Sequence, residues 1–423
     1  MLWLYATFAA ESIASATTMF VALLLFLQLG LAWPAATLLA ASLLGVRIVK
    51  PLMARQHPSP CALCACLAMA EWGMALAMAA LGVALVRGRG CMPVAAAMLM
   101  AVSLLCSWHE TLSQVLYARC LSPSRQRYWR MAVYVCSMGA MVATYGLTLL
   151  GVGSLQVLHH QSAHAVTDAW GTAMLIVASL MALLALGSTA SWLRTNTWPD
   201  VCSNQTLKVS SQRAGSRTVS ASVLSLLLLL PQSLLFFSRV LFLWAPVAQG
   251  GLGCPLPWIG MAQGTIGVVA FAAGLYAGQW QTSHLGRRRW LSGRRAERRI
   301  LMAMVAATAV SPAVYLVMTC HPPASLVLLC CATSVAQLSF GYSLNVVSML
   351  WPGLSDAPLM SASRCLGRPA IAAAVAMPAA LSGWAVQLLG FRHFFVADTL
   401  SALVTCVAAW TAWRAYTPKI QIQ

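Results

Sequence analysis

The chain has 423 residues, of which 60% are hydrophobic and only 8% are charged, and its mean hydropathy is +0.77. Such values lie outside the range of water-soluble domains and are typical of a chain surrounded mostly by lipid. The formal net charge of +18 would suit a nucleic-acid partner, but the placement of the basic residues favours a membrane topology instead. The sequence therefore predicts an integral membrane protein.

Apolar runs of roughly 20 residues, the length of a helix that crosses a bilayer, recur from the first residues to nearly the last. Transmembrane β-strands would alternate apolar and polar residues, and runs such as LLLLLPQSLLFF do not. We predict an all-α membrane protein whose first apolar run is a helix rather than a removed signal. The twelve expected spans are 3–28, 35–54, 61–86, 92–118, 130–154, 168–193, 220–247, 257–280, 300–319, 324–351, 366–389 and 393–414.

Basic residues gather in alternate loops. If the N-terminus is inside, 22 of the 26 lysines and arginines, Arg47 among them, fall in cytoplasmic segments. Because cytoplasmic loops are enriched in Lys and Arg, both termini are predicted to face the cytoplasm. The richest loop, GRRRWLSGRRAERR at 286–299, is interpreted as an anchor that meets membrane lipids, and no nucleic-acid partner is expected.

The longest polar stretch follows the sixth span and divides the chain into two halves. We predict an N-terminal six-helix bundle over residues 1–195, a cytoplasmic linker over 196–219 and a C-terminal six-helix bundle over 220–423. Residues 27–45 and 248–267 both pass from a span through a glutamine–glycine turn and a proline into the next span. A duplicated transporter would show such a repeat, with the solute path at the interface of its halves.

The apolar runs of the first half contain a few acidic residues. An ionised side chain at the bilayer centre costs at least about 3 kcal/mol, so it needs a partner, a wet cavity or a function. Glu11 in the first span is predicted near the solute. Glu71 in the third span, within LAMAEWGM, is placed on a helix-packing face.

The fourth span carries SWHETLSQVLYAR, which places Glu110 near mid-membrane, with Gln114 and Tyr117 on the same helix face. A carboxyl at that depth, next to a histidine that titrates near neutrality, is suited to exchange protons. We therefore predict Glu110 and His109 as proton-coupling residues and Gln114 and Tyr117 as solute-binding residues. The alternative is a neutral Glu110 that hydrogen-bonds a neighbouring helix.

In the second half, Arg239 is interpreted as the sole basic residue deep in a span. Because a buried cation needs an anion, Arg239 either pairs with an internal carboxylate or binds the anionic group of a solute. Tyr342 and Asn345 offer neutral hydrogen bonds and are predicted to bind the solute, with contacts between helices as the alternative. Motifs of phosphate loops, metalloproteases and serine hydrolases are absent, so no cofactor, metal or catalytic residue is expected.

The twelve-span, two-half plan resembles the major facilitator superfamily, and several stretches resemble its peptide/acetyl-CoA/drug transporter branch, which includes the AmpG-type muropeptide permeases. The sequence departs from these families at two places. Gln114 stands where the branch has a second acid. The superfamily's Gly-x-x-x-Asp-Arg loop, which falls at KPLMARQHPSP in this chain, lacks its aspartate. The similar stretches are FAAES at 8–12, VKPL at 49–52, His109-Glu110, GGLG at 250–253, GTIG at 264–267, Pro378 with SGW at 382–384, and LGFRHFF at 389–395.

The sequence thus predicts a proton-coupled secondary transporter, a monomeric symporter or permease of a bacterial cytoplasmic (inner) membrane. The two bundles would rock around a central path to admit a small polar or anionic solute, with inward transport suggested by the resemblance alone. A transport-inactive sensor or scaffold of the same fold is the first alternative, because the gate motifs are eroded. A membrane-embedded transferase that uses His109 and Glu110 is the second, although the short loops leave little room for a donor substrate.

Overall fold

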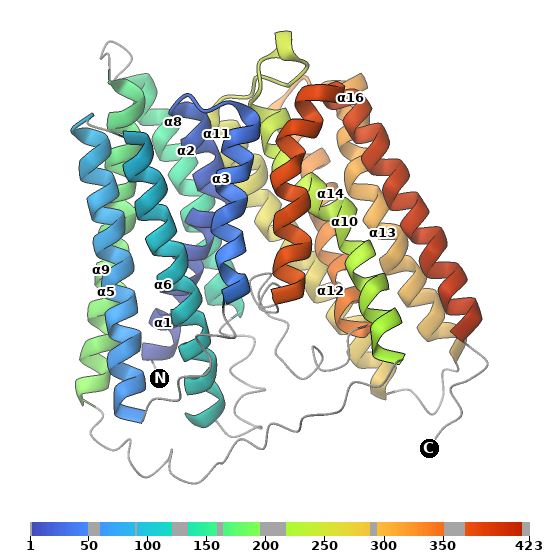
Figure 1. Ribbon diagram of the computed structural model, residues 1–423, viewed down its shortest axis with the longest axis horizontal. Coiled ribbons are helices and arrows are strands. Elements are labelled where there is room, and N and C mark those ends of the chain that lie inside the picture. Colours follow the sequence, from blue (N-terminus) through green and yellow to red (C-terminus); the bar gives the residue numbers. More distant parts are fainter. Residues whose placement is uncertain are drawn as a thin grey trace. The chain divides into compact units, whose positions relative to one another are not determined.

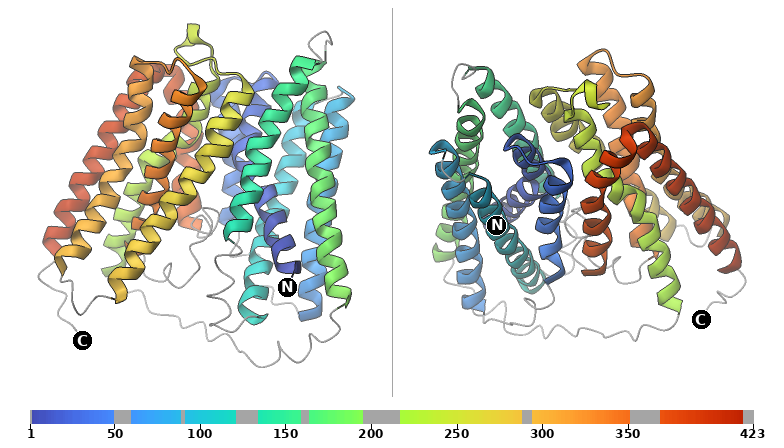
Figure 2. Two further views of the ribbon diagram at one scale, coloured as in Figure 1. Left: turned by 180° about the vertical axis from the view of Figure 1, so that it is seen from behind. Right: turned by 45° about the horizontal axis from the view of Figure 1, so that its top comes forward.

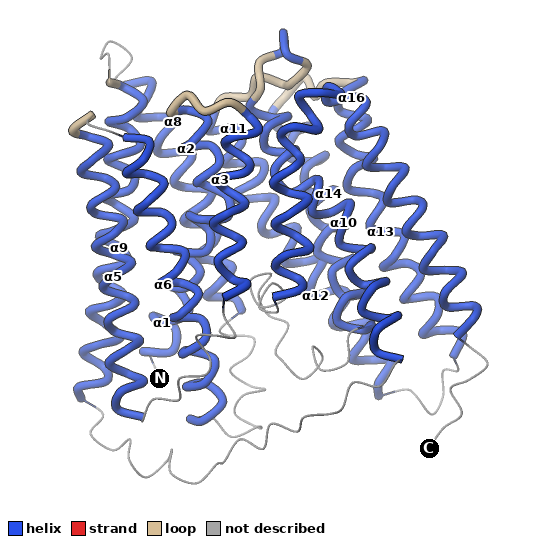
Figure 3. The backbone as a smooth tube through the Cα atoms, in the orientation of Figure 1, coloured by secondary structure: helices blue, strands red, loops and turns tan. Residues whose placement is uncertain are grey.

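The computed structural model describes residues 2–49, 60–88, 91–120, 134–158, 164–194, 217–287, 294–350 and 369–416. Every regular element within these ranges is a helix (Figure 3). Ten helical segments there are long and apolar enough to cross a membrane, and a shorter apolar helix covers Trp33–Ile48. The longest segment bends into two arms, so the described ranges hold twelve apolar helical segments. The predicted all-α fold of twelve spans is confirmed.

Contacts divide the chain into two compact units, whose helices Figure 1 labels. Unit 1 consists of Met1–Gln212 together with Pro255–Gly260 and Met360–Ala376. Unit 2 consists of Arg213–Cys254, Met261–Leu359 and Met377–Gln423. Residues 196–216 of the predicted linker, 196–219, lie outside the described residues. The predicted domain bounds therefore remain a prediction.

Unit 1 is built around its first span, nearly all of which is buried. This span is α1, continued through the π-helical turn η1 into α2. The next helices pack around it: α5 lies along both α6 and α9, and α1 contacts α6 and α9 (Figure 1). The elements are α1 (Leu2–Ala16), η1 (Thr17–Val21), α2 (Ala22–Gln28), α3 (Trp33–Gly45), η2 (Val46–Val49), α5 (Pro60–Val86), α6 (Cys91–Cys120), η3 (Ala143–Leu147), α8 (Thr148–Leu158) and α9 (Ala165–Arg194).

Helices α5 and α9 approach each other closely at Gly82 and Gly171. A Cβ atom on Gly171 would lie 2.8 Å from the carbonyl oxygen of Gly82, and a Cβ atom on Gly82 would lie 2.9 Å from that of Gly171. Small residues let helix backbones come together in lipid, where the hydrophobic effect does not drive helices together. The two glycines thus fix the spacing of α5 and α9, which carry Glu71 and Ser188.

Unit 2 contains most of the remaining helical residues, seen from two further sides in Figure 2. Helix α14 packs along α12 and α13, and α10 contacts α13 and α14. α16 turns at Gly390, whose φ of 73° and ψ of 159° belong to a region that essentially only glycine adopts. The elements are α10 (Arg217–Trp244), η4 (Val247–Gln249), η5 (Gly260–Ile266), α12 (Gly267–Arg287), α13 (Arg294–Cys320), α14 (Leu326–Leu350) and α16 (Pro369–Tyr416). The short α11 (Leu256–Ile259), the first residue of η5 and the start of α16 up to Ala376 belong to unit 1.

Candidate functional site

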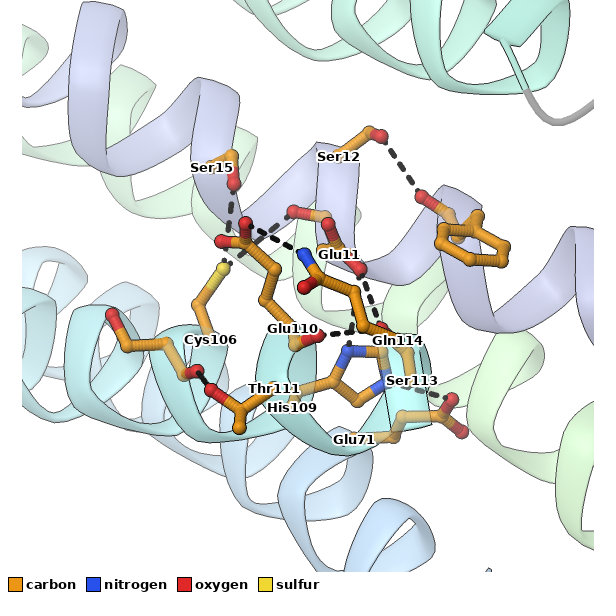
Figure 4. Close-up of polar contacts among 12 residues, drawn as sticks. Glu11, Ser12, Ser15, Glu71, Cys106, His109, Glu110, Thr111, Ser113 and Gln114 are labelled. Atoms are coloured by element: carbon orange, nitrogen blue, oxygen red, sulfur yellow. Dashed lines mark hydrogen bonds and ion pairs between the residues drawn. The ribbon is translucent and has the colours of Figure 1, made fainter. Parts of the chain in front are cut away.

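His109 lies between two carboxyl groups in the interior of unit 1 (Figure 4). Its Nε2 atom is hydrogen-bonded to Oε1 of Glu71 at 3.1 Å, and its Nδ1 atom lies 3.9 Å from Oε2 of Glu11. The three side chains come from α6, α5 and α1, and each is at most 3% exposed. We refer to them, together with Glu110, as the carboxyl–histidine cluster (Glu11, Glu71, His109 and Glu110).

Two serine hydroxyl groups hold the outer carboxyl groups of this cluster. Ser113, one helical turn after His109 on α6, donates to Oε2 of Glu11 at 3.0 Å. Ser188 on α9 donates to Oε2 of Glu71. Hydroxyl donors stabilise carboxylate oxygens that have left water, so four helices share in positioning the cluster.

Glu110 is fully buried and points away from His109 because adjacent residues face different sides of a helix. Its Oε1 atom accepts a hydrogen bond of 3.4 Å from Gln114, whose side chain is partly exposed. Glu110, Glu11 and Arg47 all act electrostatically on the thiol of Cys106, which places the three charged groups around one point of unit 1. Glu110 is therefore part of the same polar interior as His109.

Arg47 corrects two of the sequence predictions. It was assigned to a cytoplasmic segment, and Arg239 was interpreted as the only basic residue inside a span. In the structure Arg47 is only 3% exposed, and its Nη2 atom donates to Oγ of Ser15 at 2.9 Å. The turn η2 continues α3, so the long side chain reaches back into the bundle. The signal was present, because Arg47 falls within the predicted span 35–54.

The charges of this interior determine what it can do chemically. Three carboxyl groups face one arginine and one histidine, so full ionisation leaves a net negative charge even when the imidazole is protonated. An uncompensated buried charge is costly, so each ionisable side chain of this interior depends on its neighbours for hydrogen bonds and counter-charge. The arrangement is thus suited to hold protons and exchange them between Glu71, His109 and Glu11.

The other predicted site residues lie in unit 2 or outside the described side chains. Arg239 on α10 is buried. Tyr342 donates to Oε1 of Gln281 at 2.6 Å, and Asn345 donates to the carbonyl oxygens of Leu275 and Gly341 at 3.3 and 3.2 Å. The bonds to Gln281 and Leu275 join α14 to α12, whereas the bond to Gly341 lies within α14. A role in solute binding stays a prediction. The structure does not describe the side chain of Tyr117, so its predicted role in solute binding stays a prediction.

Sequence reasoning missed the partners that make the cluster. Glu71 was assigned to helix packing, although it is the direct hydrogen-bond partner of His109. Ser188 is 117 residues from Glu71 and gave no signal at all. Ser113 could have been found, because it lies four residues after His109 on the same helix.

Comparison with solved structures identifies the fold. The peptide transporter POT in complex with sulfate (mutant form) superposes with a TM-score of 0.60 at 12% identity, over 97% of this chain and 94% of that one. The nucleoside transporter NupG superposes with a TM-score of 0.61 at 13% identity, over 97% of this chain and 98% of that one. A bacterial homologue of the human lysosomal transporter Spinster, in an inward-facing and unoccupied conformation, superposes with a TM-score of 0.57 at 13% identity. The superposition covers 96% of this chain and 97% of that one.

No protein-family model matches the sequence, and no curated protein sequence matches it. Structural similarity at such low identity identifies the fold alone. The chain has the major facilitator fold, twelve transmembrane helices in two six-helix bundles, and is an integral membrane protein.

Proposed function

We propose that the protein is a proton-coupled secondary transporter that moves a small polar or anionic solute across the cytoplasmic membrane by alternating access. The observation that carries this proposal is the carboxyl–histidine cluster, buried within one bundle of a transporter fold. A proton-driven carrier needs a group that binds and releases protons away from bulk water, and lipid does not tolerate such groups without a function. We also propose, on its sequence motifs, that the chain belongs with the peptide/acetyl-CoA/drug transporter branch.

In this mechanism Glu110 carries the coupled proton. Gln114 donates to Glu110 and is partly exposed, so it links the buried carboxyl to the accessible side of α6. His109 accepts or donates a proton between Glu71 and Glu11, since each of its ring nitrogen atoms lies near one carboxyl group. Arg47 supplies a buried positive charge in the same interior. A change in the number of bound protons thus changes the charge of the whole interior and biases the bundles between two arrangements.

The test uses the purified protein in liposomes that enclose a pH-sensitive dye. Dialanine and uridine are suitable probes, because the similar solved structures are described as peptide and nucleoside transporters. We expect at least one probe to carry protons into wild-type vesicles. Glu110→Gln should abolish this proton uptake while the exchange of labelled probe continues.

Asp398→Asn is the matched control. Asp398 is a buried carboxyl group of unit 2, 2% exposed, and it does not belong to the cluster. We expect it to retain proton uptake. Proton uptake that persists in Glu110→Gln would contradict the assignment of Glu110 as the coupling residue. A wild-type protein that moves no proton with any probe, and that captures a specific protein partner instead, favours the sensor or scaffold alternative.

A further inference from the structure

Arg239 is a buried cation without a counter-ion among the described residues. Its side chain is 5% exposed, and its guanidinium carbon lies 5.4 Å from the ring centre of Phe236 and 5.5 Å from that of Phe340. Within the described ranges no carboxylate forms an ion pair with it, and its buried Nε–H has no hydrogen-bond acceptor. The alternative of an internal carboxylate partner is therefore not realised among these residues.

This arrangement is unusual in energetic terms. Arginine keeps its proton inside proteins, and an unpaired buried guanidinium loses several kcal/mol of hydration. Two aromatic faces recover only part of that loss, about 0.5–2 kcal/mol each. Among the described residues of unit 2, Asp398 is a buried carboxyl group with unused oxygen atoms, and it forms no ion pair with Arg239. No described residue of unit 2 therefore supplies the charge that Arg239 lacks.

A second donor lies near the same point. The amide of Gln337 donates to Oε1 of Gln263 at 2.6 Å, and the amide of Gln263 donates to the hydroxyl oxygen of Tyr315 at 2.6 Å. The Tyr315 oxygen accepts this bond, and no described residue accepts a hydrogen bond from its own O–H. Arg239 lies close enough to act electrostatically on this hydroxyl group.

The surrounding structure fixes both donors. Tyr315 stacks against Phe395 at 5.7 Å and meets Phe242 edge-on at 6.4 Å, so its ring cannot turn freely. The π-helical turn η5 carries Gln263 toward α13 and α14, and π turns of this kind occur frequently at functional sites. The buried polar side chains of this region thus come from four elements, α10, η5, α13 and α14.

We propose that Arg239 and Tyr315 bind the anionic group of the solute, a carboxylate, phosphate or sulfate, with Phe236 and Phe340 beside it. The guanidinium supplies two parallel N–H donors to a planar or tetrahedral anion, and the tyrosine O–H supplies a third. That the bound anion is transported rests on the proposed function. Binding itself does not, because it needs no proton gradient.

The test measures anion binding to the full chain in nanodiscs of zwitterionic lipid. Sulfate and benzoate are titrated at constant ionic strength, with chloride as the reference, and binding is followed by calorimetry. We expect saturable binding of at least one of the two, lost in Arg239→Gln. Tyr315→Phe, which keeps the ring and removes the O–H, should bind about tenfold more weakly, or about 1.4 kcal/mol. Arg392→Gln, which removes the same charge from an exposed position, should bind as wild type does.

Several results would overturn the inference. The first is equal binding in wild type and Arg239→Gln. The second is no binding to the wild type at about 0.1 M anion, 100-fold above a millimolar Kd. The third is loss of sulfate and benzoate binding in nanodiscs that contain phosphatidylglycerol, which assigns the site to a lipid headgroup. Melting curves of each variant exclude misfolding, and Tyr315→Phe gives an independent readout. Glu110→Gln should still bind the anion. Anion binding without proton uptake refutes the transporter proposal alone, and proton uptake without anion binding refutes this inference alone.

Discussion

Two buried arginines have opposite surroundings. Arg47 donates to Ser15 and shares its interior with Glu11 and Glu110, whereas Arg239 has two phenyl rings and no described carboxylate. The first cation balances charge that the protein itself supplies. The second has no described counter-charge, so we expect the two arginines to contribute differently to stability.

We expect Arg47→Met and Arg239→Met to change stability in different directions. Removal of one partner from a buried charge network costs about 3–5 kcal/mol, because the remaining charges stay buried and unpaired. Replacement of an unpaired buried cation by an apolar side chain of similar length is neutral or stabilising. Thermal unfolding in detergent, in buffer free of sulfate and carboxylates, should therefore show a lower Tm for Arg47→Met and an equal or higher Tm for Arg239→Met. A Tm for Arg239→Met as low as that of Arg47→Met would mean that Arg239 is a structural residue.

At the scale of single residues the sequence predicted part of the site. His109 and Glu110 stand out because polar residues are rare inside an apolar run, and both are buried as expected. Glu71 and Ser188 could not be assigned, because their roles depend on which helices pack together. The contacts that define the cluster join residues 38 and 117 positions apart.

Helices in this protein are held together by close backbone contact as well as by polar groups. In unit 2, a Cβ atom on Gly274 of α12 would clash with the carbonyl oxygen of Leu338, and one on Gly341 of α14 would clash with that of Phe271. In unit 1 the same role falls to Gly82 and Gly171. Because α5 and α9 carry the hydrogen-bonded pair Glu71 and Ser188, their spacing also sets the geometry of the cluster.

Helix α9 offers a matched pair of glycine substitutions. In Gly171→Ala the new methyl group would lie 2.6 Å from Cγ2 of Val86 and 2.8 Å from the Gly82 oxygen, so the helices must separate. Overpacking of this kind costs about 1–3 kcal/mol. Gly187→Ala meets open space and should stabilise the helix by about 0.5–1 kcal/mol. Melting curves of the two variants test the contact, and an unchanged Tm in Gly171→Ala would show that α5 and α9 are not tightly packed.

The whole molecule has an orientation that the basic residues predict. If both termini are cytoplasmic, the connections after α10 and α13 face outside, where Cys254 and the exposed Cys320 lie. A membrane-impermeant maleimide added to intact cells should therefore label Cys320, as mapped by mass spectrometry. Labelling of Cys320 only in inverted membrane vesicles would reverse the predicted topology.

Cys254 adds a pH dependence to the same experiment. Burial raises the pKa of the Cys254 thiol to about 11, and only the thiolate reacts. Its labelling rate should be low at pH 7 and rise about tenfold per pH unit through pH 9 and beyond, since the thiolate remains a minor species there. In denatured protein the rise should level off near pH 9. A plateau near pH 9 in the folded protein would mean that Cys254 is not buried.

The sequence by itself determined that the protein lies in a membrane, that it is helical and that it has twelve spans, because hydrophobicity and span length are local properties of the chain. It also located the buried acid and histidine of the fourth span. Only the tertiary structure decided that Arg47 turns inward, that Glu71 bonds His109 and that Arg239 lies apart from every described carboxylate. These three findings depend on helix packing, which brings together side chains that are far apart in the sequence. Whether a buried charge has a counter-charge is decided only by which side chains the packed helices place next to it.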